Sequence, residues 1–136
     1  HPSVAMVGAI GQPDAEKGEV PCAYVQLNDG ENSTPSELIS FCENKITEMA
    51  ALPKYIEIIE EMPLTAVGKI FKPDLRKKAI SRVFEEALSK ASVKAQVSSV
   101  VEHPKEGLKA HIFTEENPEN ISKVLSPYTV GWELMK

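Results

Sequence analysis

A short segment with one lysine between two prolines is the part of this sequence best suited to chemistry. It reads Met-Pro-Leu-Thr-Ala-Val-Gly-Lys-Ile-Phe-Lys-Pro and occupies residues 62–73. Pro63 and Pro73 fix the backbone φ angle near its ends, and Gly68 allows conformations that other residues avoid. The ammonium group of Lys69 is thus presented on a short, adjustable loop, where a compact cation with three donors can contact anionic oxygens.

A Gly-Lys pair alone also has a simpler interpretation, because most loop lysines are solvated surface charges. The pair is not a Walker A loop, which requires glycine five positions before Gly68 and Ser or Thr after the lysine. Pro63 and Ile70 stand at those two positions. The case for Lys69 therefore depends on the sequence around it.

The basic residues of the chain are unevenly placed. The net charge of −5 argues against a nucleic-acid binder. Residues 69–82 nevertheless contain a single acid, Asp74, among several bases: Lys69, Lys72, Arg76, Lys77, Lys78 and Arg82. One interpretation is an anionic partner, with Lys72 and Arg76 as candidate anion contacts. The other is a solvated helix face.

Length and composition indicate a globular protein. The 136 residues allow one domain, or a domain of about 80 residues with an appendage. No apolar run approaches a membrane span and no secretion signal is present, so we expect a cytoplasmic location. We expect buried thiols at Cys22 and Cys42, and no metal site, because the histidines lack zinc-ligand spacing: His1, His103 and His111. The first residue is His1 rather than methionine, which suggests a piece of a longer protein.

The segments that precede the lysine loop have clear local signals. The apolar run 4–10 predicts a central strand buried on both faces, and residues 20–27 predict a second strand, at an edge or bulge because of Pro21. Thr-Pro-Ser-Glu at 34–37 predicts a capped helix start, followed by an apolar face that Pro53 terminates: Leu38, Cys42, Ile46 and Met49. Residues 55–62 alternate as a half-buried strand that leads into the loop.

A second helix is predicted to begin at Pro73, and its apolar stripe is well defined: Leu75, Ala79, Ile80, Val83, Phe84, Ala87 and Leu88. Residues 95–101 and 108–113 predict a β-hairpin. A short helix after Asn117 and a last strand at 129–135 follow. This order from residue 55 onward is compatible with a ferredoxin-like arrangement.

Several short segments, taken in order, resemble those of one known family. They are His-Pro-Ser-Val at 1–4, Gly-Gln-Pro-Asp at 11–14, Lys-Gly-Glu at 17–19, Leu-Pro-Lys at 52–54, Met-Pro-Leu-Thr at 62–65 and Gly-Lys-Ile at 68–70. Together they resemble the C-terminal domain of the AMP-forming acyl-CoA synthetases, which belong to the adenylate-forming superfamily. One departure is Ala-Ala at 50–51, where many members have Tyr-Lys, so a contact made by that lysine is not carried over.

The resemblance implies an α+β fold, with a small mixed sheet flanked by helices. Residues 1–90 would form the C-terminal lid domain, and residues 91–136 would add an extension of hairpin, helix and strand. We expect the N-terminal ATP-binding domain of the same polypeptide to be the partner of this domain, and the fragment alone to be inactive.

The resemblance also implies a mechanism. A fatty acid would be adenylated by ATP with Mg²⁺, and CoA would then displace AMP; these are substrates of the full enzyme, and no cofactor is expected on the fragment. Lys69 would be the catalytic cation for adenylation, and the neighbouring residues would present it: Pro63, Thr65 and Gly68. The alternative is a non-catalytic binding or regulatory module that uses the basic helix 72–82 or the extension 92–136.

Overall fold

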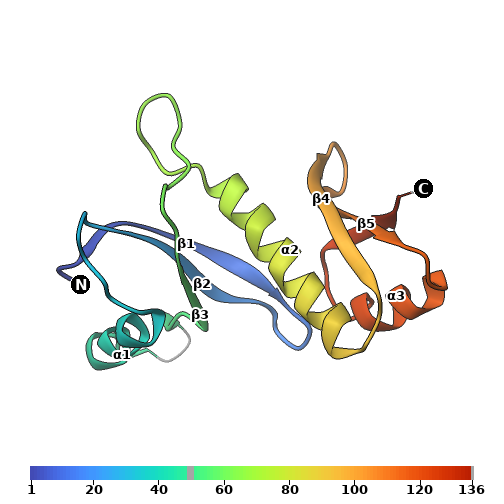
Figure 1. Cartoon of the computed structure of the whole chain (residues 1–136), viewed down its shortest axis with the longest axis horizontal. Helices are drawn as coiled ribbons and strands as arrows, with labels where there is room; N and C mark the ends of the chain where they lie inside the picture. Colours follow the sequence, from blue (N-terminus) through green and yellow to red (C-terminus); the bar gives the residue numbers. More distant parts are fainter. Residues whose placement is uncertain (49–50, 136) are drawn as a thin grey trace. The chain divides into compact units, whose positions relative to one another are not determined.

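The computed structural model describes residues 1–48 and 51–135. Its elements follow the order β1 (Val4–Asp14), β2 (Gly18–Leu27), α1 (Pro35–Lys45), β3 (Tyr55–Ile58), α2 (Lys72–Lys90), β4 (Ala95–His103), β5 (Gly107–Thr114), α3 (Pro118–Leu125) and β6 (Gly131–Leu134), as drawn in Figure 1. The chain forms two compact units, one of His1–Gly11 with Val20–Leu75, the other of Gln12–Glu19 with the chain from Arg76 onward. Helix α2 contributes residues to both units. The two-domain division at residue 90 stays a prediction.

The first unit is built on a three-stranded sheet of order β1-β2-β3. Strands β2 and β3 are parallel, with Cys22 opposite Tyr55 and Val25 opposite Ile58. The prediction that the first strand is central is wrong, since β1 lies at the edge. The prediction that it is buried on both faces is also wrong, since Ile10 is buried but Val7 is 52% exposed. The exposed side of β1 also carries small apolar residues, so the sequence shows no alternation of polar and apolar positions. A continuous apolar run does not indicate which side of a strand is covered.

The second strand is the central one, although Pro21 suggested an edge or a bulge. The pairing of β2 with β3 begins at Cys22. The absence of an N–H on Pro21 therefore costs no hydrogen bond between these two strands. The carbonyl of Pro21 remains in use, accepting from the Lys54 N–H at 2.8 Å. A proline is thus tolerated one residue outside the ladder.

Helix α1 begins as predicted. Thr34 is its N-cap, and the Thr34 hydroxyl accepts from the Glu37 N–H at 3.2 Å. The helix ends at Lys45, earlier than the apolar spacing suggested, and Met49 and Ala50 lie outside the described residues. Its buried residue, Leu38, packs with side chains of the sheet: Ala23, Val25 and Ile56.

The strand predicted at 55–62 is shorter in the structure. Strand β3 ends at Ile58, and the Ile59 N–H still donates to the Val25 carbonyl at 2.8 Å. Met62 is buried, but its N–H donates to the Gln26 side-chain oxygen at 2.7 Å. The Gln26 side chain thus takes the place of a backbone partner in the sheet, at the point where the chain turns into the lysine loop.

The second unit has a sheet of order β4-β5-β6, in which β4 and β5 are antiparallel and β5 and β6 are parallel. The hairpin, helix and strand predicted after residue 92 are confirmed. The ferredoxin-like arrangement is wrong, because that fold would require β3 in the same sheet as β4 and β5, whereas β3 belongs to the other sheet. Fold class is confirmed as α+β, with small mixed sheets and helices.

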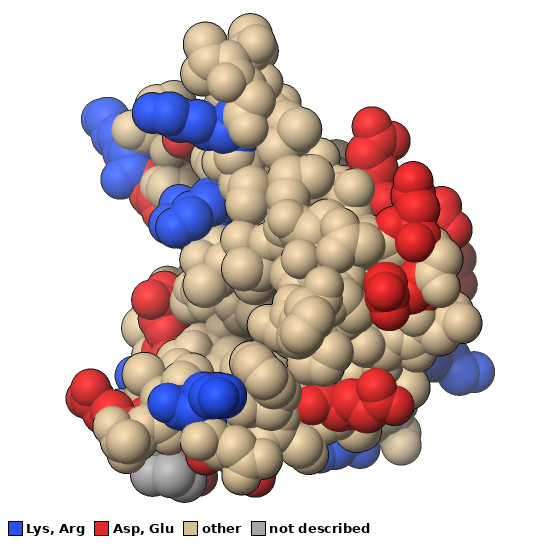
Figure 2. All heavy atoms as spheres, turned by 90° about the vertical axis from the view of Figure 1, so that its left-hand side faces the viewer, with Lys and Arg blue, Asp and Glu red and all other residues tan. Residues whose placement is uncertain are grey.

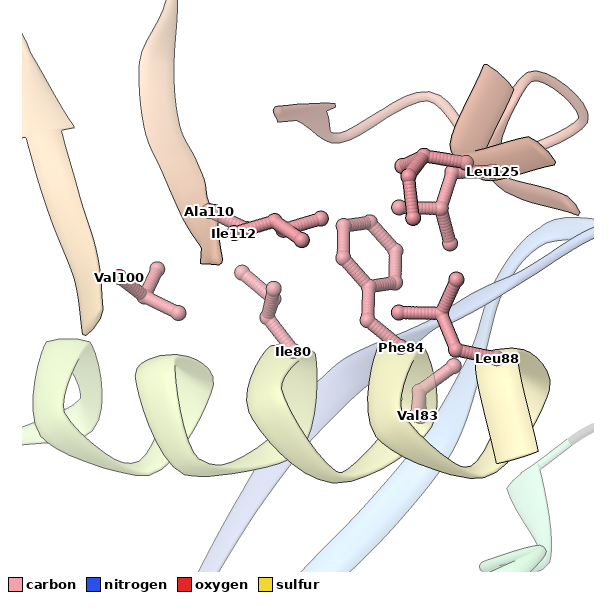
Figure 3. Close-up of a cluster of buried hydrophobic side chains, with 9 residues drawn as sticks. Ile80, Val83, Phe84, Leu88, Val100, Ala110, Ile112 and Leu125 are labelled. Atoms are coloured by element: carbon pink, nitrogen blue, oxygen red, sulfur yellow. The ribbon is translucent and has the colours of Figure 1, made fainter. Parts of the chain in front are cut away.

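A shared core holds α2 and the extension together. Figure 3 shows side chains of α2 pointing at those of β4, β5 and α3. The buried set consists of Ile80, Val83, Phe84 and Leu88 from α2, Val100, Ala110 and Ile112 from the sheet, and Ile121 and Leu125 from α3. This confirms the predicted apolar stripe of α2. None of the helices in the described residues combines the length and the hydropathy needed to cross a membrane.

We expect Phe84→Ala to destabilise the chain by about 3–5 kcal/mol, because the fully buried ring would leave a cavity. Phe113→Ala is the matched control, since Phe113 is 43% exposed and truncating it should change stability by less than about 1 kcal/mol. Urea denaturation of residues 1–136 measures both. Equal losses in the two variants would contradict the assigned core.

We expect Tyr128 to make the chain less stable in alkali. Burial raises the pKa of the Tyr128 hydroxyl above its ordinary value of 10.0, and the charges of Asp14 and Glu86 act in the same direction. The folded state therefore favours the neutral phenol. The contribution of Tyr128 to the free energy of unfolding is complete below about pH 10 and declines as the pH rises further. Tyr128→Phe should lose less stability than the wild type as the pH rises above about 10, measured by denaturation at each pH. If the stability of Tyr128→Phe declined as steeply with pH as that of the wild type, the prediction would be wrong.

Candidate active-site loop

The lysine loop is a small β-hairpin rather than an irregular connection. The Thr65 N–H donates to the Lys69 carbonyl at 2.7 Å, and the Gly68 N–H donates to the Thr65 carbonyl at 3.0 Å. Leu64 and Ile70 form an antiparallel bridge below this turn. Gly68 has φ of 83°, and the three residues 66–68 between Thr65 and Lys69 match a turn closed by a left-handed glycine. The turn and the bridge therefore fix the backbone conformation on both sides of Lys69.

Lys69 is the first residue after the turn. Its N–H donates to the Thr65 hydroxyl at 3.1 Å, so Thr65 contacts the Lys69 residue through both its backbone and its side chain. The Lys69 side chain is exposed, and in the described ranges 1–48 and 51–135 it forms no ion pair. Its ammonium group is therefore accessible to an external anion.

The base of the hairpin is anchored on both sides. On the entering side, Met62 is buried and bonded to Gln26, as described above. On the leaving side, Ile70 packs over Gly8, where an added Cβ would lie 3.2 Å from the Ile70 Cγ2 atom. In Figure 1 the hairpin follows β3 and precedes α2, and its tip projects away from the sheet; Figure 2 shows uncharged side chains at this end with basic ones close below. Anchored ends and an exposed tip suit a group that acts on something outside the unit.

The other predicted site residues fall into two sets. Pro63, Thr65 and Gly68 lie with Lys69 in the hairpin, and the Pro63 carbonyl accepts from the Phe71 N–H at 2.8 Å. Lys72 is exposed at the first position of α2. Arg76 is also exposed on α2 but belongs to the second unit, so the structure does not join it to the hairpin.

The basic helix is only partly available to an external anion. Arg82 is half-buried, and its Nη2 donates to the Gln12 side-chain oxygen at 2.6 Å within the second unit. Lys77 is also half-buried, whereas Lys78 is exposed. These residues do not form one continuous solvated face.

A polar network on β5 and β6 was not identified from the sequence. The Lys109 ammonium lies 2.6 Å from Glu106 and 3.9 Å from Glu133, and the His111 Nε2 atom lies 3.0 Å from Glu133. The hydrogen bond from Lys109 and its charge lower the pKa of Glu106, and the same bond raises the pKa of Lys109. The strand register that places His111 opposite Glu133 creates the network, and no local sequence pattern indicates that register.

The two cysteines and the possible metal ligands belong to parts of the chain other than the hairpin. Cys22 is buried and Cys42 is half-buried, and they are not joined in a disulfide. Within residues 1–48 and 51–135, no group of three or more His, Cys, Asp or Glu side chains is placed to hold a metal ion.

Comparison with known families accounts for the first half of the chain. The family described as "AMP-binding enzyme C-terminal domain" matches residues 1–69, which include the whole hairpin turn and Lys69. The chain belongs to this family. The matched residues include β1, β2, α1, β3 and the turn up to Lys69, and the match ends before α2 begins at Lys72.

Curated relatives of this domain are acyl-CoA ligases. Over 88 residues the chain is 43% identical to the marinolic acid–CoA ligase of Pseudoalteromonas sp., which covers 65% of this chain and 14% of that protein. Over 76 residues it is 43% identical to the human mitochondrial medium-chain acyl-CoA ligase ACSF2, which covers 56% of this chain and 12% of that protein. The chain therefore spans less than a fifth of the length of either relative.

A solved structure agrees with these sequence relatives. The anthranilate CoA ligase AuaEII, determined in complex with anthranoyl-AMP, superposes with a TM-score of 0.54 at 29% identity, covering 61% of this chain and 16% of that one. The α+β arrangement of this chain therefore matches the corresponding part of an adenylate-forming enzyme.

We expect Gly68→Ala to strain the hairpin by about 1 kcal/mol. Gly68 has a positive φ, but nothing lies within 4 Å of an added Cβ, so the cost would come from the backbone alone. Gly68→Asn should cost less, because asparagine tolerates the left-handed conformation better. Denaturation of the two variants side by side measures the difference. If asparagine cost as much as alanine, the glycine would not be required for its φ angle.

Proposed function

We propose that this chain is the mobile C-terminal domain of an AMP-forming acyl-CoA synthetase, and that Lys69 is its catalytic residue. One observation carries the proposal: Lys69 is exposed on an anchored hairpin and forms no ion pair with the residues that the structure describes. The family match and the acyl-CoA ligase relatives support it.

The reaction would proceed in two steps. A carboxylate attacks the α-phosphate of ATP, which forms an acyl-adenylate and releases pyrophosphate; the thiol of CoA then attacks the acyl carbon and AMP leaves. In the first step two anions must approach each other, and negative charge accumulates on the phosphate oxygens. An ammonium group that contacts carboxylate and phosphate oxygens together would offset this repulsion. Lys69 would align and stabilise, and would not abstract a proton.

The substrate class that we propose is a fatty acid. Of the relatives reported above, one is named as a ligase of marinolic acid and the other as a ligase of medium-chain acyl groups. ATP with Mg²⁺ and CoA would be substrates of the full enzyme. The remaining part of the polypeptide would bind the nucleotide and the acid, because this chain covers only 14% of its relative.

The hairpin residues would deliver Lys69 and withdraw it. Gly68 and Thr65 set the position of the lysine backbone, and Pro63 bonds the returning strand through its carbonyl. Movement of the whole domain would bring Lys69 to the nucleotide for adenylation and remove it for thioester formation. Lys72, at the start of α2, and Arg76 would be secondary anion contacts.

We expect Lys69→Ala in the full-length enzyme to slow adenylation by at least about a hundredfold, the usual cost of losing one preorganised donor. Thioester formation from supplied acyl-adenylate should change little, because Lys69 acts in the first step. Pyrophosphate release and thioester formation are measured separately. Lys123→Ala is the control, since it removes an exposed lysine of α3 outside the matched region. Equal loss in both steps would contradict the assigned role.

A further inference from the structure

The side chain of Gln26 connects the central strand of the first sheet to the hairpin that carries Lys69. The Gln26 oxygen accepts from the Met62 N–H at 2.7 Å. Gln26 is the one amide in a run of residues, 20–27, that is otherwise apolar. A half-buried amide in such a run needs a hydrogen-bond partner, and the Met62 N–H is one.

This bond lies where the backbone pairing between β2 and β3 ends. The last register pair is Val25 with Ile58, and the Ile59 N–H donates to the Val25 carbonyl at 2.8 Å. The chain then leaves the sheet and reaches Met62, which is 2% exposed. The Gln26 side chain therefore ties the entering arm of the hairpin to the sheet.

The direction of the Gln26 side chain follows from the alternation along β2. Its neighbours Val25 and Leu27 pack with Leu38 of α1. Successive side chains of a strand point to opposite faces, so Gln26 lies on the face away from α1. The hairpin begins on the face where Gln26 can reach it.

The leaving arm of the hairpin is held in a different way. Ile70 packs over Gly8 of β1, where an added Cβ would lie 3.2 Å from the Ile70 Cγ2 atom and would clash with the Leu75 side chain. Close packing thus fixes this arm, whereas a side-chain hydrogen bond fixes the entering arm. The position of the hairpin therefore depends on Gln26 from one side.

Without the Gln26 oxygen, the buried Met62 N–H would lose its acceptor. An unsatisfied buried N–H is costly, so the entering arm would shift until this group reached water or another acceptor. Lys69 would move with it, because Thr65 follows Met62 on the same arm and bonds to Lys69. A displacement of about 1 Å can slow a catalysed step about a hundredfold.

We infer that Gln26 is a positioning residue for adenylation: its bond to the Met62 N–H sets where the Lys69 ammonium group stands relative to the first sheet. The inference rests on the proposed function. Gln26 acts through the hairpin and does not need to contact a substrate.

The test uses the full-length enzyme and the fatty acid that gives the highest turnover in a series from acetate to palmitate. Gln26→Met keeps the length of the side chain and replaces the amide oxygen by a weak acceptor. It should slow adenylation on the order of tenfold, the effect of leaving one buried N–H without its partner. Thioester formation from supplied acyl-adenylate should stay within about twofold of the wild type. Equal loss in both steps would overturn the inference.

A conservative variant and a matched control sharpen this test. Gln26→Glu keeps an acceptor oxygen at the same reach and should hold adenylation within about twofold of the wild type. Gln12→Met removes a comparable hydrogen bond, from Arg82 within the second unit, and should change neither step by more than about twofold. A loss in Gln26→Glu as large as in Gln26→Met would overturn the inference, and so would an equal, selective loss in Gln12→Met.

A double variant tests whether Gln26 acts through the lysine. Gln26→Met combined with Lys69→Ala should adenylate at the rate of Lys69→Ala alone, because a residue that positions Lys69 has no effect once the ammonium group is gone. A further loss on the order of tenfold in the double variant would overturn the inference.

The single variants also separate the inference from the proposed function. If Lys69→Ala selectively slows adenylation while Gln26→Met does not, the positioning role fails and the proposed function stands. If Lys69→Ala has no selective effect, the proposed function itself fails.

Discussion

The apolar stripe of α2 is the constraint on which both compact units depend. The helix has 19 residues. Leu75, near its start, is fully buried in the first unit, where the Leu75 side chain packs against Gly8. Phe84 and Leu88, further along, are fully buried in the core of the second unit. One amphipathic helix thus supplies core residues to two separate sheets, and the hairpin with Lys69 is attached directly to its N-terminal end.

Within the first unit, the hairpin combines a fixed backbone with the Lys69 side chain, which forms no ion pair with any residue in the described ranges. An ion pair within the domain would compete with an incoming anion for the ammonium group. Here the backbone is held by Thr65 and by the buried Met62, so the Lys69 ammonium does not need an ion pair to be positioned. Positioning and charge are provided by different residues.

The sequence predicted those features that depend on neighbouring residues. Thr34 and Asn117 each cap a helix as expected, because capping involves only the next two or three residues. The stripe of α2 was likewise predictable from its period. The edge position of β1 was not, because a strand's neighbours are chosen by distant segments and small apolar residues occupy its exposed side. For the candidate site, the motif singled out Lys69 and Gly68 as candidates. The bond between Gln26 and Met62 joins residues 36 positions apart and has no local sequence signal.

The shared core of α2 and the extension has a consequence for the ancestry of this chain. If Ile80, Phe84 and Leu88 of α2 faced water, the helix would be poorly soluble. Without these three residues, the extension would lose the side chains of α2 on which its own core packs. Neither part could have been acquired or lost alone without exposing the other. A homologue that ends with this helix must therefore carry polar side chains at these positions, or cover them with a different structure.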